Sequence, residues 1–271
     1  MLIAQLTDLH IKQSGKLAYK KVDTLGCLRH AINHINRLKP MPDRVIITGD
    51  LADFGTPDEY QLLVAELQRL KPVVRVIPGN HDNRTHLRDA LQGWLAFDTP
   101  VFCNFSEHVG CYQLIGLDSS VPGQPYGMLS QASLQWLDEQ LSATQHHPAL
   151  LFMHHPPMRV GLQHMDVQNL QNSEALYEVL QSNPHVAGIV VGHVHRPIVA
   201  TWHRIPVWVG PSHSHAVTLD LDPQAPACFS LEPGAIQLFR LEPEGICSHI
   251  SYIDAVEGPY PFFDENHCLI D

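Results

Sequence analysis

Side chains that bind metal ions occur in five short clusters spread over most of the chain. The first three are Asp8-Leu9-His10, Gly49-Asp50 and Gly79-Asn80-His81-Asp82. His154-His155-Pro156-Pro157 and Gly192-His193-Val194-His195 complete the set. Carboxylate, imidazole and amide oxygen together suit Fe, Mn, Co or Zn better than Ca or Mg. The clusters therefore predict a transition-metal site, provided that folding brings them together.

The spacing within the clusters indicates how two ions would be held. Asp8 and His10 are two residues apart, as are His193 and His195, so both members of each pair can turn to one ion. Asp50 has two oxygens with which to bridge two ions. Two cations about 3.5–4 Å apart clamp a phosphoryl group and lower the pKa of a bound water to about 7. The pattern predicts phosphate-ester hydrolysis by metal-bridged hydroxide, without a serine, cysteine or histidine nucleophile.

Each cluster directly follows a short apolar run that is rich in β-branched residues. These runs are residues 2–4, 45–47, 73–77, 150–152 and 189–191. Runs of this length that end at Gly or Pro are typical of buried strands. Open α/β sheets bind their ligands beyond the carboxyl ends of the strands. We therefore expect the five clusters to meet at one edge of the fold.

The elements between the clusters predict a parallel sheet in the first half of the chain. Strands are expected at 2–6, 44–48 and 73–77. A helix over 23–38 separates the first two strands. A second helix, between the other two, begins at Thr56-Pro57, where Thr56 and Glu59 form a capping box. Shorter strands follow residue 94, the clearest over 111–117. A helix over 130–141 then leads to a strand over 149–153, and a helix over 173–180 to a strand over 187–191. Residues 158–172 are expected to form an irregular loop, and antiparallel strands are expected at 205–209, 216–221, 235–240 and 246–253.

Composition limits the partners. The chain has 271 residues, of which 44% are hydrophobic and 17% charged, enough for one large α/β domain with a smaller appended piece. A net charge of −11 opposes binding to a nucleic-acid polymer, which needs a basic surface. No apolar run approaches the ~20 residues of a membrane helix, so no membrane partner is expected. The chain begins directly with the first strand, and its six cysteines, without a CxxC pair, fit free buried thiols. We expect a cytoplasmic protein.

The ordered clusters resemble those of the calcineurin-like metallophosphoesterases. Within that family, three further segments resemble the class III phosphodiesterases: Phe152-Met153-His154-His155-Pro156-Pro157, Met165-Asp166, and the stretch from Gly258-Pro259 to Asp264-Glu265-Asn266. This branch includes bacterial cyclic-nucleotide phosphodiesterases and, most similar to this chain, a glycerophosphodiesterase that acts on many small diesters. The resemblance extends over nearly the whole chain.

The resemblance implies an architecture. The fold expected from it is α/β, a four-layer α/β/β/α sandwich with a small C-terminal cap or dimerisation region. Residues 1–200 would form the metallophosphoesterase core, and residues 201–271 the remaining core strands, the cap or dimerisation segment and the C-terminal tail. A homodimer or a larger even assembly is expected. The aromatic tail, residues 257–271, suits packing against a surface or a neighbouring subunit.

The resemblance also implies a ligand set for two divalent transition-metal ions, Fe, Mn, Co or Zn. Four residues would hold the first ion: Asp8, His10, Asp50 and His195. Four would hold the second, with Asp50 as the bridge: Asp50, Asn80, His154 and His193. His154 is chosen over His155 because the ligand in the family is the histidine that closes the strand.

Three further residues are expected near the substrate. In the family, the residue at His81 faces the phosphate and stabilises charge or gives a proton to the leaving alkoxide; a supporting hydrogen bond alone is the alternative. His215 matches a histidine close to the substrate, although His213 leaves the register open. Asp53 departs from the uncharged residue of the glycerophosphodiesterase, and a carboxylate there could repel phosphate or bind a substrate hydroxyl.

The function expected is hydrolysis of a small-molecule phosphodiester. The sequence does not separate 3′,5′-cyclic nucleotides such as cAMP from glycerophosphodiesters. The alternatives are a phosphomonoesterase or a nuclease on the same fold, and a non-catalytic scaffold. The acidic composition opposes the nuclease, and the complete ligand set opposes the scaffold.

Overall fold

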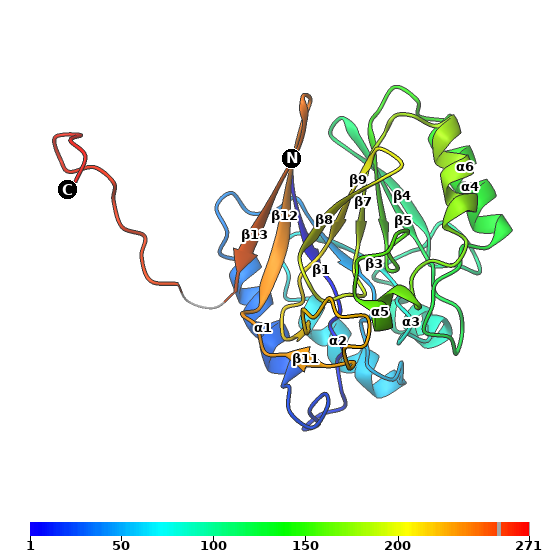
Figure 1. Ribbon diagram of the computed structural model, residues 1–271, viewed down its shortest axis with the longest axis horizontal. Coiled ribbons are helices and arrows are strands. Elements are labelled where there is room, and N and C mark those ends of the chain that lie inside the picture. Colours follow the sequence, from blue (N-terminus) through cyan, green and yellow to red (C-terminus); the bar gives the residue numbers. More distant parts are fainter. Residues whose placement is uncertain (254–255, 271) are drawn as a thin grey trace.

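The computed structural model describes residues 1–253 and 256–270, and its centre is two β-sheets packed face to face (Figure 1). The first sheet has the order β13-β12-β1-β2-β3. Strands β1, β2 and β3 pair in parallel, and β12 and β13 add antiparallel strands beside β1. Its strands are β1 (Leu2–Leu6), β2 (Arg44–Thr48), β3 (Val73–Ile77), β12 (Ala235–Glu242) and β13 (Gly245–Tyr252).

The second sheet has the order β4-β5-β6-β7-β9-β8. Its four central strands are parallel, and β4 and β8 are antiparallel edge strands. Its strands are β4 (Phe105–Val109), β5 (Tyr112–Leu117), β6 (Ala149–Met153), β7 (Val186–Val191), β8 (Ile198–Trp202) and β9 (Ile205–Val209). A separate two-stranded sheet pairs β10 (Ala216–Val217) with β11 (Phe229–Ser230).

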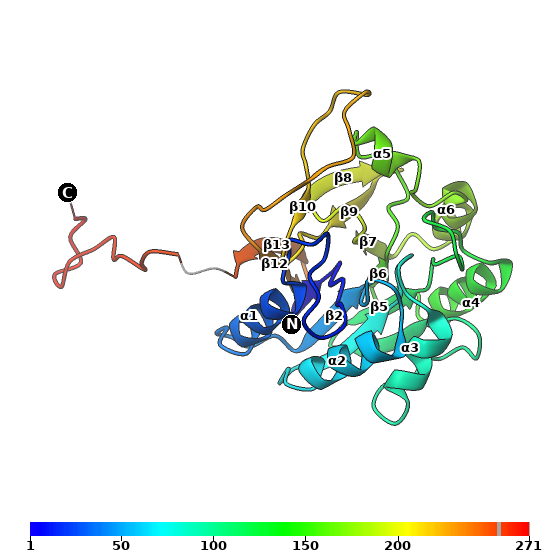
Figure 2. The ribbon, with the colours of Figure 1, turned by 90° about the horizontal axis from the view of Figure 1, so that it is seen from below.

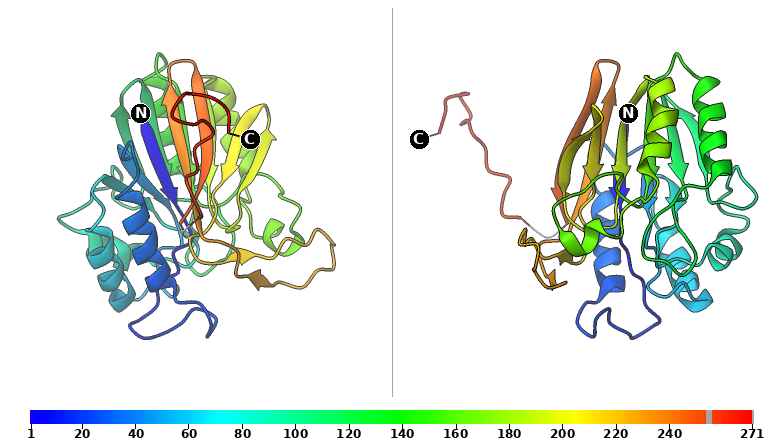
Figure 3. Two further views of the ribbon diagram at one scale, coloured as in Figure 1. Left: turned by 90° about the vertical axis from the view of Figure 1, so that its left-hand side faces the viewer. Right: turned by 45° about the vertical axis from the view of Figure 1, so that its right-hand side comes forward.

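Helices cover the outer face of each sheet (Figure 1; Figure 3). The first sheet is covered by α1 (Thr24–Ile35), α2 (Pro57–Leu67) and α3 (Arg84–Leu91), and the second by α4 (Gln131–Ser142) and α6 (Ser173–Ser182). The short helix α5 (Gln163–Asp166) lies in a loop below the second sheet, on the same side as β10 (Figure 2). Of the helices within residues 1–253 and 256–270, none has the length and apolar character to cross a bilayer.

Alternating side chains along the strands build two hydrophobic cores. In β1 and β2, Ile3 and Ile46 belong to the core between the sheets, whereas Ala4 and Val45 belong to the core beneath α1 and α2. Successive residues of a strand point to opposite faces, so one strand serves both cores. The arrangement confirms the four-layer α/β/β/α sandwich.

Two of the predicted helix starts have the expected caps. The Asp23 side chain accepts the backbone N–H of Gly26 at 2.9 Å, and the Ser130 hydroxyl accepts that of Ser133 at 3.0 Å. Each satisfies a backbone donor that has no partner within its own helix.

Several local predictions differ from the structure. Strand β9 was expected to be antiparallel, but it pairs in parallel with β7 and is antiparallel only to β8. The predicted strand 216–221 is reduced to β10, because the chain leaves the sheet after Val217. Helix α3 was not predicted, because only Leu87 and Leu91 of its residues are buried. Four cysteines expected to be buried are exposed: Cys111, Cys228, Cys247 and Cys268.

The C-terminal tail, residues 256–270, projects away from the sandwich (Figure 1). Its aromatic side chains are exposed, Phe262 to 79% and Tyr260 to 69%. Within the described part of the tail these rings are therefore open to solvent rather than covered by the body of the same chain. The last residue of the predicted tail, Asp271, lies outside the described residues.

A buried ion pair joins α3 to the end of β5. Asp118 is 1% exposed and accepts hydrogen bonds from the Arg84 guanidinium and from the backbone N–H groups of Cys103 and Ser120, both at 3.0 Å. These bonds hold the connection between the two sheets against the second sheet.

The Asp118→Ala substitution should destabilise the fold strongly. It leaves the Arg84 charge and two backbone donors without their acceptor, and breaking one side of a buried pair costs about 3 kcal/mol. Urea denaturation followed by circular dichroism measures the change. Glu242→Ala, which removes the partner of Arg240 in an exposed pair, should leave the transition midpoint unchanged. Equal midpoints for the two variants would contradict the assignment.

Candidate active site

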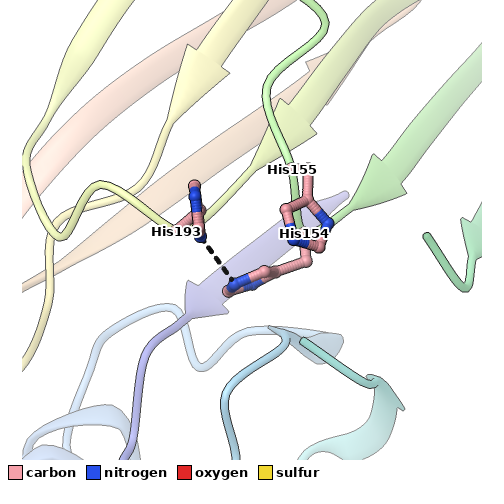
Figure 4. Close-up of side chains that lie close together, drawn as sticks. All are labelled: His154, His155 and His193. Carbon is pink, nitrogen blue, oxygen red and sulfur yellow. Dashed lines mark hydrogen bonds between the residues drawn. The ribbon is translucent and has the colours of Figure 1, made fainter. Parts of the chain in front are cut away.

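The five clusters meet at one edge of the two sheets. Strands β1, β2 and β3 of the first sheet, and β6 and β7 of the second, each end immediately before one of them. Figure 4 shows His154 and His155 at the end of β6 beside His193, which follows β7, next to the end of β1. The parallel direction of these strands puts their carboxyl ends together, as expected.

The backbone that carries the clusters is in the left-handed region at five of the seven predicted metal ligands. Non-glycine residues adopt this conformation at a cost of roughly 1–2 kcal/mol each. The φ angles are +56° at Asp8, +45° at His10, +51° at Asp50, +72° at His193 and +57° at His195. Residues held in this way are commonly found at functional sites, where the surrounding structure enforces them.

Glycines allow the loops to touch. Gly49 has a φ of +99°, and a Cβ on it would lie 2.4 Å from Nδ1 of His154. A Cβ on Gly79 would lie 2.2 Å from Oδ1 of Asp50. A side chain at Gly49 would push apart loops of the two sheets, and one at Gly79 would push apart the loops after β2 and β3.

Asp50 is at the centre of the site. Its Oδ2 lies 3.6 Å from Nε2 of His10 and 3.4 Å from Nε2 of His154, and its Oδ1 accepts the backbone N–H of His81 at 2.9 Å. Burial alone would raise the pKa of Asp50, but the charges of His154 and His81 hold it well below its usual range. One ionised carboxylate thus lies between two groups of donors.

The first group consists of His10, His195 and Asp8. The Nε2 atoms of His10 and His195 lie 3.2 Å apart, and Nε2 of His195 is 3.4 Å from Oδ1 of Asp8. Asp8 Oδ2 is buried and has no hydrogen-bond partner within the described chain. Burial, with a further contribution from the charge of Asp50, raises the pKa of Asp8 to about 6.

The second group consists of His154, Asn80 and His193. Nε2 of His154 is 3.2 Å from Oδ1 of Asn80 and 3.3 Å from Nδ1 of His193. The opposite nitrogen, Nδ1 of His154, donates to the Thr48 carbonyl at 2.8 Å, so Nε2 is the nitrogen that faces the site. Burial lowers the pKa of His154, but the negative charges of Asp50 and Asp8 raise it to about 9.

These donors fit divalent metal ions. Buried imidazole nitrogens, carboxylate oxygens and one amide oxygen converge in two groups that share Asp50, and they crowd negative charge and lone pairs that a cation would compensate. His155 is also close to His154 and His193, with ring centroids 4.8 Å from each, but its Nδ1 bonds to the Ser119 hydroxyl at 2.8 Å.

The two histidines expected near the substrate both line a cavity of about 430 Å³ in front of the site. Nδ1 of His81 donates to the Asp53 carbonyl at 2.8 Å. His215 lines the cavity, whereas His213 bonds to the Thr24 carbonyl at 3.2 Å. Burial and the neighbouring His195 and His10 lower the pKa of His215 to about 2, so its imidazole is neutral.

Both carboxylate oxygens of Asp53 contact neighbouring side chains. Its Oδ1 is 3.1 Å from Nδ1 of His10, and its Oδ2 is 2.6 Å from Nζ of Lys12. Burial opposes ionisation, but these two hydrogen bonds lower the pKa of Asp53 to about 2. With both oxygens engaged, the carboxylate orients His10 rather than facing a phosphate or a substrate hydroxyl.

Sequence reasoning gave no role to Asp82, which ties two of the clusters together. Its carboxylate accepts the backbone N–H groups of Gly79, Leu51 and Ala52 at 2.8–3.1 Å and the Tyr60 hydroxyl at 2.9 Å. The loop after β3 is thereby fixed to the loop after β2. The sequence offered one indication of this role, namely that Asp82 belongs to the cluster Gly79-Asn80-His81-Asp82.

The sequence and the fold match those of known proteins. The sequence model of the calcineurin-like phosphoesterase family matches residues 1–197. The chain belongs to this family. It is 44% identical over 273 residues to a probable glycerophosphodiester phosphodiesterase, GpdQ, of Arcobacter nitrofigilis, which covers all of both chains. It is 30% identical over 210 residues to the 3′,5′-cyclic adenosine monophosphate phosphodiesterase CpdA of Vibrio vulnificus, which covers 78% of this chain and 75% of that one.

A solved structure shares the fold of this phosphoesterase. It is a dimetal phosphatase from Danio rerio with a TM-score of 0.63 and 16% identity, over 94% of this chain and 99% of that one. At this identity the likeness concerns the fold alone.

Replacing Asp82 with Ala should loosen the site and lower stability. Three backbone donors lose their acceptor, and each buried donor left without a partner costs about 1–3 kcal/mol. We expect a lower thermal midpoint, together with faster amide exchange at Leu51 and Ala52. Asp89→Ala, an exposed carboxylate on α3, is the matched control and should change neither. Unchanged exchange at Leu51 and Ala52 would show that Asp82 does not hold the two loops together.

Proposed function

We propose that this calcineurin-like phosphoesterase hydrolyses small phosphodiesters with two divalent metal ions. The observation that carries the proposal is the position of Asp50 Oδ2, 3.6 Å from Nε2 of His10 and 3.4 Å from Nε2 of His154. An oxygen equidistant from two donor groups suits a bridge between two ions. The names of the relatives, which include a glycerophosphodiester phosphodiesterase and a cyclic AMP phosphodiesterase, support diester rather than monoester substrates.

The proposed ligands fall into two sets that share Asp50. The first ion would be held by Asp8, His10, Asp50 and His195. The second would be held by Asp50, Asn80, His154 and His193. This mixture of nitrogen and oxygen donors favours Fe, Mn, Co or Zn. When bound, the ions supply positive charge for the phosphate and a water of lowered pKa.

The chain's own residues would orient the substrate and give a proton to the leaving alkoxide. With Nδ1 of His81 donating to the Asp53 carbonyl, Nε2 faces the cavity, and in the doubly protonated ring it can give its proton to the leaving alkoxide and keep the Nδ1 proton. The Nδ1 atom of neutral His215 is 3.0 Å from the Ser214 hydroxyl. Its other nitrogen can donate a hydrogen bond to the diester, and the ring adds no charge to the site. Both histidines are therefore placed among the catalytic residues, with Asp50.

The alternatives are less well supported. The described residues that line the cavity include no Lys or Arg, which a nuclease would use along a strand. A non-catalytic scaffold has no need for five strained, convergent metal-binding residues. A phosphomonoesterase remains the closest rival and is separated from a diesterase by the relative rates on the two ester types.

Replacing Asp50 with Ala should lower diesterase activity by more than about 100-fold, because even residues that only orient metal ligands contribute about 10–100-fold. Asn80→Ala should lower activity and the bound metal content. The measurements are the rates on bis(p-nitrophenyl) phosphate and p-nitrophenyl phosphate and the metal content by mass spectrometry. The diester should be the better substrate of the native protein. Asp89→Ala is the control and should keep the native activity. Undiminished diesterase activity in Asp50→Ala would refute the proposal.

Replacing Asp53 with Ala should weaken metal binding at the first site. The substitution removes the carboxylate that orients His10, and loss of such a partner lowers metal affinity by about 10–100-fold. Calorimetric titration of the metal-free protein with Mn²⁺ measures the affinity, and circular dichroism checks the fold. Lys12→Met should have a smaller effect, since His10 keeps its carboxylate. An unchanged affinity in Asp53→Ala would contradict the role.

We also propose that the chain forms a homodimer or a larger even assembly in the cytoplasm. The support for assembly is the exposed aromatic tail, since exposed apolar groups of this size commonly mark an interface. The support for a cytoplasmic location is the exposure of Cys111, Cys228, Cys247 and Cys268, because exposed thiols persist in a reducing compartment. Residues 1–200 remain the proposed catalytic core and 201–271 the segment that completes it.

A further inference from the structure

Three rings pack against one another in the wall of the cavity. Tyr19 comes from the loop between β1 and α1, Phe229 from β11, and His215 from the segment before β10. Their centroids are 4.9 Å apart for Tyr19 and Phe229, 5.3 Å for Tyr19 and His215, and 5.7 Å for His215 and Phe229. His215 in turn lies 4.6 Å from the ring of His195. The aromatic surface is thus continuous with the proposed metal ligands.

Tyr19 is held in place by an unfavourable backbone. Its φ is +51° and that of Lys20 is +58°, within a tight turn in which the Ala18 carbonyl accepts the N–H groups of Lys21 and Val22 at 2.9 Å. Turns with two left-handed residues normally contain Asn and Gly, and each other residue costs roughly 1–2 kcal/mol. The turn holds the Tyr19 ring in the cavity wall, 51% exposed and open to a bound molecule.

The composition of the cavity wall indicates what the rings would bind. Asp50 is the one acidic residue among the described residues that line the cavity, and no cationic side chain joins it there. Beyond the donors and the rings, the lining includes apolar Met165, Val217 and Ala227 together with the uncharged amide of Gln168 and the imidazole of His164. An ammonium group on the alcohol would find no free carboxylate, whereas a planar ring would gain stacking energy from Tyr19 and Phe229.

We propose that Tyr19 and Phe229 are specificity-determining residues that stack on a planar ring of the substrate's alcohol group. They would favour diesters that carry a nucleobase over those that carry glycerol or an aminoalcohol. Val217 and Met165 supply apolar contacts around the ring. This inference rests on the proposed diesterase function and assigns the alcohol-binding part of the same site.

The test compares Tyr19→Leu and Phe229→Leu with the native protein loaded with Mn²⁺. Leu keeps the apolar volume and the backbone strain at position 19 but removes the ring. Stacking of one base contributes about 1 kcal/mol or more, so KM for cyclic AMP should rise at least about 5-fold. KM for glycerophosphoethanolamine and for glycerophosphocholine should change less than about 2-fold. Tyr19→Phe keeps the ring, so this variant should have the native KM for cyclic AMP. Tyr252→Leu, an exposed ring on β13, is the control.

A binding measurement separates this inference from the proposed function. Calorimetry with adenosine 5′-monophosphate should show at least about 5-fold weaker binding in both Leu variants, whether or not the native protein turns over diesters. Weaker binding without any native turnover would overturn the function and keep the aromatic site. Normal turnover with unchanged KM and binding in both variants would overturn the aromatic site alone. A rise in KM that is equal for all three diesters, or largest for glycerophosphocholine, would also overturn it, the latter in favour of a cation–π site.

Discussion

The site depends on a backbone conformation that is unfavourable for residues with side chains. Five residues with side chains, Asp8, His10, Asp50, His193 and His195, are left-handed, and together they represent roughly 5–10 kcal/mol of local strain. This is as large as the net stability of a typical domain. Strain of this size persists only because the sheets hold both ends of each loop, as when Asp8 N–H donates to the Gly49 carbonyl at 3.0 Å and His10 N–H to that of Asp50 at 2.9 Å. As a result, the side chains of Asp8 and His10 turn to the same side of the backbone, and so do those of His193 and His195.

The proposed metal centre is also an interface between the two sheets. The first sheet supplies Asp8, His10, Asp50 and Asn80, and the second supplies His154, His193 and His195. Buried Gln5 fixes the spacing between them, because its Nε2 donates to the Thr48 hydroxyl in the first sheet and to the Val191 carbonyl in the second, each at 2.8 Å. The bonds from His154 to the Thr48 carbonyl and from the His193 N–H to Asp8 cross the same boundary. Packing of the sandwich therefore sets the distances on which the chemistry depends.

The sequence was informative where one residue type has one structural meaning. Short apolar runs that lead into metal-binding side chains predicted β1, β2, β3, β6 and β7 and the meeting of their ends. The direction of β9 could not be predicted, since an apolar run does not state its neighbour, and α3 has too few buried residues for a periodic signal. The hydrogen-bond partners of Asp53 and Asp82 lie in loops that are distant in sequence. The sequence therefore showed that both residues are carboxylates but could not predict which groups they contact. Exposure of four cysteines was likewise a property of the fold, not of spacing.

Chemistry and selectivity occupy different parts of this architecture. The donors sit on strand ends that the two sheets fix in space, whereas Tyr19, Phe229 and Met165 come from the β1–α1 loop, the β10–β11 sheet and α5. Loops on a rigid scaffold tolerate substitution better than the strands beneath them. Under the proposed assignment, a change of ring or charge in those segments alters which alcohol is accepted without moving Asp50 or its neighbours. This separation gives a physical reason why one fold can serve relatives named for glycerophosphodiesters and others named for cyclic nucleotides.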